Sequence, residues 1–106
     1  MGLFDFIRRP DINEGVRTCA AMPGAMLLDV RNPDEYAMGH IPGSVNLPLS
    51  EIRTAEDQIP DMDTSLFIYC LSGARSSRAV AELRNMGYTN LCNLGGISKW
   101  RGEIEK

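Results

Sequence analysis

The segment from Ser65 to Met86 constrains the fold of this chain more than any other part of it. Residues 66–70, Leu-Phe-Ile-Tyr-Cys, are apolar without alternation, as is typical of a strand covered on both faces of a parallel sheet. The glycine-containing loop from Leu71 to Arg75 follows directly. Residues 76–86 then have the periodicity of an amphipathic helix, which Gly87 ends as a C-terminal cap. The inward face of this helix is expected to carry Val80, Leu83 and Met86.

The rest of the chain alternates between shorter strands and helices. Strand-like runs occur at Met26–Val30, Ser44–Leu47 and Asn90–Leu94. A first helix is expected after a cap at Asn13 or Asp11, with Val16, Cys19 and Ala20 on one face. A second is expected from the capping sequence Asn32-Pro33-Asp34-Glu35 to Gly39. Two more are expected over Ser50–Gln58 and around Trp100. This alternation predicts an α/β fold with a central, mainly parallel sheet of four to five short strands, flanked by helices on both faces. At 106 residues, the chain has room for one domain, 1–106.

Polar residues follow two of the predicted strands at the point where each strand ends. Asp29 and Arg31 lie at the end of one strand, and Cys70 ends another. In open parallel sheets, ligands bind beyond the carboxyl ends of the strands. The architecture therefore predicts that Asp29, Arg31 and the Cys70 loop lie at the same edge of the sheet.

Cys70 stands where several groups can stabilise a negative charge. Backbone N–H groups of the loop and of the first helical turn can point toward its sulfur. These donors, the positive end of the helix and the side chain of Arg75 favour the thiolate over the thiol. Cys70 is thus predicted to be a nucleophile that needs no neighbouring histidine. Cys19, on a helix, and Cys92, within an apolar strand, are expected to be small buried hydrophobes.

Composition excludes several classes of function. The chain has three cysteines without a C-x-x-C motif and a single histidine, so neither a zinc site nor a disulfide framework is expected. A net charge of −3 argues against a nucleic-acid or membrane partner, and no apolar run approaches membrane-spanning length. Residues 1–10 lack the features of a signal peptide and are expected to form an apolar arm packed on the domain. The cytoplasm is the expected compartment.

Three blocks of the sequence resemble the rhodanese (sulfurtransferase) family in its single-domain form. The first block, residues 28–44, contains LDVR, PDEY and GHIPGS. The second is the loop CLSGARS at residues 70–76, and the third is LGGI followed by Trp100. The blocks run from about Leu27 to Arg101 in the order and spacing of the family.

The resemblance implies sulfur transfer through a persulfide on Cys70, without a cofactor or metal. The sulfur would be cradled by the backbone of Leu71, Ser72, Gly73, Ala74, Arg75 and Ser76. The sulfur donor would be a small sulfur-containing anion or a protein persulfide, and the acceptor would be a thiol or cyanide. The protein itself would be a monomer or a weak homodimer. Arg75 favours thiosulfate, because relatives that use mercaptopyruvate tend to have threonine there. Asp29 and Arg31 are expected to form a structural ion pair, and His40 to be a hydrogen-bonded loop residue.

Three other functions are compatible with parts of this pattern. Tyrosine phosphatases also place a cysteine and an arginine in one loop, but their loop is one residue longer between the two. Four residues separate Cys70 from Arg75 here, and the smaller cradle suits a single sulfur atom better than a phosphate. Rhodanese-like domains also serve as regulatory binding modules, which commonly lack the loop cysteine. A role as a persulfide carrier between protein partners is the third alternative.

Overall fold

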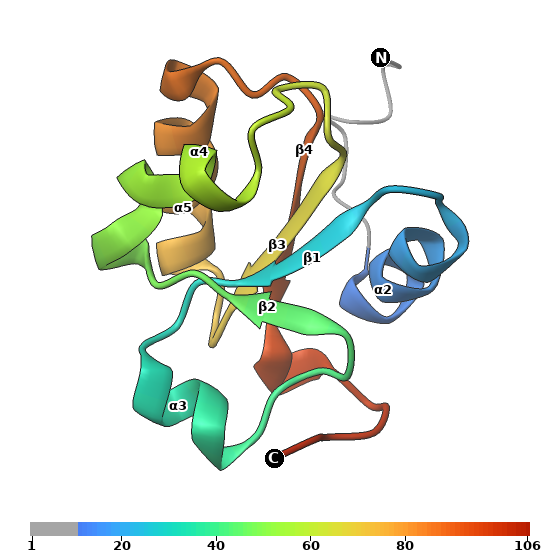
Figure 1. The fold of residues 1–106 in the computed structure, drawn as a ribbon. Coiled ribbons are helices and arrows are strands. Elements are labelled where there is room, and N and C mark those ends of the chain that lie inside the picture. Colours follow the sequence, from blue (N-terminus) through green and yellow to red (C-terminus); the bar gives the residue numbers. More distant parts are fainter. Residues whose placement is uncertain (1–10) are drawn as a thin grey trace.

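The computed structural model describes residues 11–106, which form one layer of sheet between two layers of helix (Figure 1). The strands are β1 (Met26–Asp29), β2 (Ser44–Asn46), β3 (Leu66–Cys70) and β4 (Leu91–Gly96). They form a four-stranded sheet in the order β2-β1-β3-β4, and every pairing is parallel. The predicted α/β class and parallel sheet are confirmed. The apolar arm expected at residues 1–10 lies outside the described residues.

Helices cover both faces of the sheet, as predicted. Helix α2 (Ile12–Ala21) lies against one face, and α5 (Ala74–Met86), α4 (Ala55–Gln58) and the 3₁₀ helix η1 (Leu49–Thr54) lie against the other (Figure 1). No helix within residues 11–106 has the length and apolarity needed to cross a membrane.

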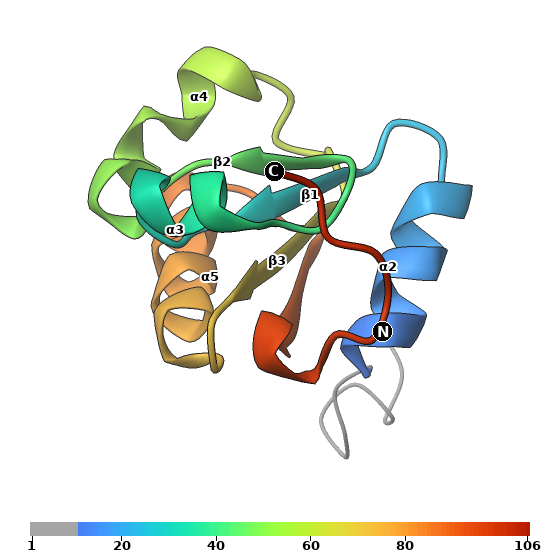
Figure 2. The ribbon, with the colours of Figure 1, turned by 90° about the horizontal axis from the view of Figure 1, so that it is seen from below.

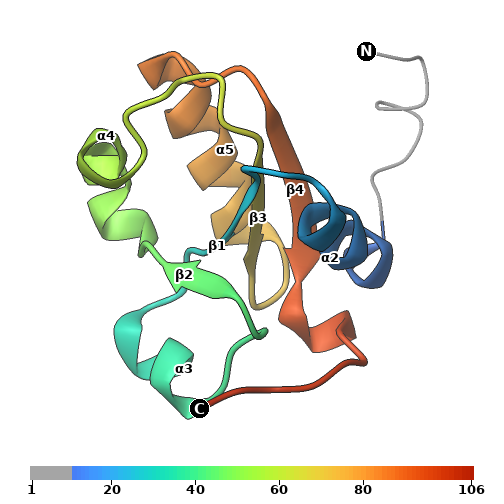
Figure 3. The same ribbon diagram turned by 45° about the vertical axis from the view of Figure 1, so that its right-hand side comes forward.

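Two short elements follow strand ends. They are α3 (Pro33–Met38), after β1, and the 3₁₀ helix η2 (Ile97–Lys99), after β4. Figures 2 and 3 show the end of the chain running beside α3, where His40 and Glu105 exchange backbone hydrogen bonds of 2.9 and 2.8 Å.

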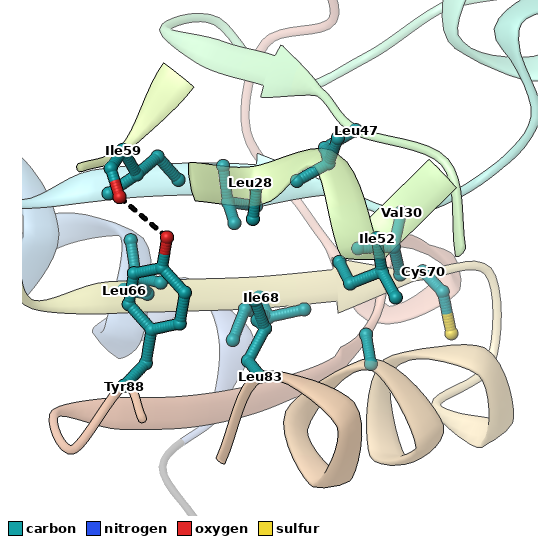
Figure 4. Close-up of a cluster of buried hydrophobic side chains, with 12 residues drawn as sticks. Leu28, Val30, Leu47, Ile52, Ile59, Leu66, Ile68, Cys70, Leu83 and Tyr88 are labelled. Carbon is teal, nitrogen blue, oxygen red and sulfur yellow. Dashed lines mark hydrogen bonds between the residues drawn. The ribbon is translucent and has the colours of Figure 1, made fainter. Parts of the chain in front are cut away.

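The sheet supplies side chains to two separate hydrophobic cores. In β3, Leu66, Ile68 and Cys70 point toward α5, whereas Phe67 and Tyr69 point toward α2. Figure 4 shows the first core, in which these β3 side chains meet those of α5 and η1. Because successive strand residues face opposite layers, and both layers are apolar, β3 is apolar without alternation. Cys70 therefore lies on the α5 face of the sheet.

The first helix differs in detail from its prediction. Asp11 is the cap, and its carboxylate accepts the N–H groups of Asn13 at 3.1 Å and Glu14 at 3.4 Å. Ala20, predicted to face inward, is exposed, and Ile12 is buried instead. The helix turns by about 100° per residue, so the residue after the buried Cys19 is rotated away from the sheet.

Two other elements also differ. The segment expected to be helical over Ser50–Gln58 is mostly 3₁₀ helix, and only its last residues, Ala55–Gln58, are α-helical. Strand β4 continues through Gly95 and Gly96, so the last helical turn ends before Trp100 rather than surrounding it.

Candidate active site

The loop after β3 is wrapped around the sulfur of Cys70. The N–H groups of Gly73 and Ser76 donate to the Cys70 Sγ at 3.0 and 3.3 Å. Gly73 has φ +114°, a left-handed conformation that favours glycine and reverses the chain just before α5 begins. In Figure 4 the sulfur points toward the start of α5. Leu71, Ser72 and Ala74 are exposed, whereas Cys70 is only 1% exposed.

This environment favours the charged form of Cys70. Burial raises the pKa of the Cys70 thiol. The hydrogen bond between its Sγ and the Ser76 Oγ at 3.5 Å, together with those from the backbone of Ser76, Gly73 and Ser72, lowers it, and the net result is a lowered pKa. Cys19 has the opposite balance, because burial and the proximity of Cys92 raise the pKa of its thiol. The surroundings of the two thiols thus lower the pKa of Cys70 and raise that of Cys19.

Alkylation by iodoacetamide should measure that difference. The Cys70 rate is expected to reach half its maximum below the ordinary thiol pKa of about 8.5, because the thiolate is the reacting form. Cys19, whose pKa is raised, serves as the internal comparison and should react only at higher pH. Peptide mapping by mass spectrometry across a pH series gives both profiles. A Cys70 profile centred at or above the ordinary value would contradict this expectation.

Asn93 is a member of the site that sequence reasoning missed. The side-chain oxygen of Asn93 accepts hydrogen bonds from the Ser76 hydroxyl at 2.8 Å and from the Gly95 N–H at 2.9 Å. Its amide nitrogen donates to the Ser77 hydroxyl at 2.9 Å. Asn93 thereby joins β4, at the point where its pairing with β3 shifts register, to the first turn of α5. A polar amide inside the otherwise apolar strand is the signal that could have identified it.

The loop packs directly onto the backbone of β4. The N–H of Ser98 donates to the carbonyl oxygen of Leu71 at 3.2 Å. A Cβ on Gly96 would lie 2.1 Å from the same Leu71 oxygen and 2.6 Å from the Cα of Ser72. Glycine is therefore required at position 96 for close approach of two backbones, not for an unusual φ.

Arg75 is held in an ion pair with Glu35. The guanidinium Nη1 and Nη2 donate to the two carboxylate oxygens of Glu35 at 2.6 and 3.0 Å. This hydrogen-bonded pairing with Arg75, only partly opposed by burial, lowers the pKa of Glu35 to about 2. The sequence predicts a capping role for Glu35 in α3 and contains no local signal for this partner. Glu35 has that role too, and accepts the N–H of Asn32 at 2.9 Å.

Asp29 and Arg31 form the buried ion pair that the sequence suggested. Arg31 Nη2 donates to Asp29 Oδ2 and to the carbonyl oxygen of Gly39, each at 2.7 Å, and Arg31 Nε also donates to the same carboxylate. Asn46 donates to the backbone oxygens of both Asp29 and Arg31 at 3.0 Å. Their charges are satisfied by each other and by the backbone, so they brace β1, β2 and the turn at Gly39.

His40 lies in that turn as a hydrogen-bonded residue. Its Nδ1 is 2.8 Å from the carbonyl oxygen of Tyr36, and its ring stacks on the Tyr36 ring at 3.7 Å. Its Nε2 is 3.6 Å from a carboxylate oxygen of Glu105. Within residues 11–106, the structure places no group of three or more histidine, cysteine or acidic side chains that could hold a metal ion.

Fold and site together define an α/β domain in which two backbone N–H groups donate to a cysteine sulfur at the carboxyl edge of a parallel sheet. A family model for the rhodanese-like domain matches residues 14–103. The chain belongs to the rhodanese-like family, whose named relatives include sulfurtransferases.

Individual relatives agree with this assignment. The protein is 43% identical over 82 residues to YqhL of Bacillus subtilis, across 76% of this chain and 64% of YqhL. It is 37% identical over 71 residues to the thiosulfate sulfurtransferase PspE of Escherichia coli, across 66% of this chain and 68% of PspE. A solved structure described as rhodanese with anions from E. coli matches 77% of this chain and 98% of its own, with a TM-score of 0.72 and 32% identity.

Proposed function

We propose that this protein is a sulfurtransferase that carries sulfane sulfur as a persulfide on Cys70. The observation that carries the proposal is the pair of backbone N–H groups, from Gly73 and Ser76, that donate to the Cys70 sulfur. Such donors stabilise a thiolate before attack and a persulfide anion after it. The name of the relative PspE, a thiosulfate sulfurtransferase, supports the same chemistry.

With thiosulfate as donor, the reaction has two balanced steps. The Cys70 thiolate attacks the outer sulfur of thiosulfate, a sulfur–sulfur bond forms, and sulfite leaves with the electron pair of the broken bond. An acceptor such as cyanide or a thiolate then attacks the outer sulfur of the persulfide and releases the Cys70 thiolate. Neither step requires proton transfer by the protein, so the mechanism needs no general base at the sulfur.

The loop residues have distinct parts in this proposal. The backbone of residues 71–76 cradles the transferred sulfur, and Arg75 presents its guanidinium at the end of the loop. Because Cys70 is 1% exposed, we expect the exposed loop residues to move when a donor reaches its sulfur. Asp29 and Arg31 support the edge of the sheet on which the loop rests.

Intact-mass spectrometry after incubation with thiosulfate tests the proposal. The mass of one sulfur atom should be added to the reduced chain, and cyanide should remove it with formation of thiocyanate. Repeated turnover with both reagents would identify an enzyme, whereas a stable adduct released only by a protein thiol would identify a carrier. Aryl phosphate serves as the comparison substrate. Its hydrolysis, without any sulfur adduct, would contradict the proposal in favour of a phosphatase.

A further inference from the structure

The ion pair between Arg75 and Glu35 joins the start of α5 to α3. It also changes the net charge near Cys70 that acts on an approaching sulfur donor. Both terminal nitrogens of the Arg75 guanidinium bind the Glu35 carboxylate, with one oxygen facing each nitrogen. The side chains are only partly exposed, 32% for Arg75 and 28% for Glu35. Arg75, in the first turn of α5, is the only cation among residues 71–75, and the Glu35 carboxylate compensates its charge.

Glu35 is held in place independently of Arg75. It occupies the third position of α3, where its carboxylate also accepts the N–H of Asn32 and completes a capping box. With a pKa lowered to about 2 by the Arg75 hydrogen bonds, the carboxylate stays ionised throughout the pH range of an enzyme assay. The pair therefore contributes a permanent negative charge beside the site, as well as a positive one.

We propose that Glu35 is a specificity-determining residue, and that it disfavours doubly charged sulfur donors relative to donors of lower charge. This inference rests on the proposed sulfurtransferase function. A thiosulfate dianion approaching a thiolate is repelled, and the attraction of Arg75 is offset by the carboxylate bound to it. A singly charged donor is repelled less by the thiolate and by the Glu35 carboxylate. The geometry thus favours organic persulfides and thiosulfonates over thiosulfate as the donor class.

The charge of Glu35 can be removed without removing its other contacts. Glutamine keeps an oxygen that can accept the N–H of Asn32, and capping boxes use glutamate or glutamine at this position. It cannot form the charged, two-pronged pair with Arg75, so the guanidinium becomes available to an anionic donor. Glu35→Gln therefore changes the electrostatics of the site while preserving the start of α3.

The test compares two donors that form the same Cys70 persulfide. Thiosulfate carries two negative charges and releases sulfite, whereas benzenethiosulfonate carries one and releases benzenesulfinate. With cyanide as acceptor, Glu35→Gln should raise the ratio of kcat/KM for thiosulfate to that for benzenethiosulfonate by about tenfold, equivalent to about 1.4 kcal/mol. A single charge acting on one extra charge of the substrate has an effect of this order.

Two further variants separate charge from geometry. Asp34→Asn removes one negative charge from the neighbouring, exposed position of α3, and should leave the donor ratio within about twofold of the original, because solvent screens exposed charges. Glu35→Asp keeps the charge but shortens the side chain. It should retain the original donor ratio even where the absolute rates fall.

The outcomes distinguish this proposal from the proposed function. An unchanged donor ratio in Glu35→Gln, with both rates lowered equally, would make Glu35 a residue that only positions the loop, and would overturn the specificity proposal alone. An equal change in Asp34→Asn would show a general charge effect and would overturn it too. If the original protein forms no thiocyanate from either donor, the proposed sulfurtransferase function fails, and the specificity proposal fails with it.

Discussion

Replacement of Cys70 by serine is expected to reduce thiocyanate formation by at least about a thousandfold, to the background rate. A serine hydroxyl is not ionised in this cradle at neutral pH, and an oxygen cannot hold the transferred sulfur as a persulfide. The mass adduct after thiosulfate treatment should disappear as well. Steady-state assays with thiosulfate and cyanide, together with intact-mass spectra of the same preparation, measure both effects.

The other two cysteines provide matched controls. Cys19→Ser and Cys92→Ser remove a thiol from the α2 side of the sheet and leave the Cys70 loop unchanged. Both variants should form the adduct, although Cys19→Ser places a polar group in a buried position and should melt at a lower temperature. Full turnover in Cys70→Ser, or an adduct mapped to Cys19 or Cys92, would refute the assignment of the nucleophile.

The second large effect is expected from Gly96→Ala. The added methyl group would meet the backbone of Leu71 and Ser72, which cannot rotate away as a side chain could. Overpacking of this kind costs about 1–3 kcal/mol, and displacement of the loop by about 1 Å is expected to lower kcat/KM by about a hundredfold. Thermal unfolding and steady-state kinetics measure the two consequences separately.

Gly15→Ala is the matched control for this change. A Cβ on Gly15 would lie 2.3 Å from Leu94, but from the end of its flexible side chain rather than from backbone. Alanine also has about 1 kcal/mol better helix propensity than glycine within α2, which offsets part of the clash. Activity should therefore survive Gly15→Ala. Equal losses of kcat/KM in the two variants would show that the contact of Gly96 with the loop has no special role.

The sequence predicted those parts of the site that depend on contiguous residues. The apolar run ending at Cys70, the loop and the periodic helix after it form one local unit, so their order could be read directly. The position of Asp29 and Arg31 at the same sheet edge followed from the general rule for parallel strands. The capping sequence at Asn32 also predicted the start of α3, and Gly39 predicted its end.

The partners that come from distant segments could not be predicted in the same way. The pairing of Arg75 with Glu35 depends on how α3 is placed beyond β1, which no local pattern specifies. The contact of Asn93 with Ser76 depends on the register shift between β3 and β4. The prediction for Ala20 was wrong because alanine is small and occurs on either face of a helix. Its position beside Val16 and Cys19 therefore did not specify how α2 is rotated about its axis.

The packing of the loop on β4 also has a consequence for the order in which the protein folds. The strand, loop and helix around Cys70 are contiguous and can form early, but Gly96, Ser98 and Asn93 reach them only when the last strand of the sheet docks. Such long-range parallel pairing closes a large loop of chain and is slow to form. In partly folded states, the amide donors of the local unit can thus already lower the pKa of the Cys70 thiol, whereas the contacts that fix the loop against β4 develop only when that strand docks.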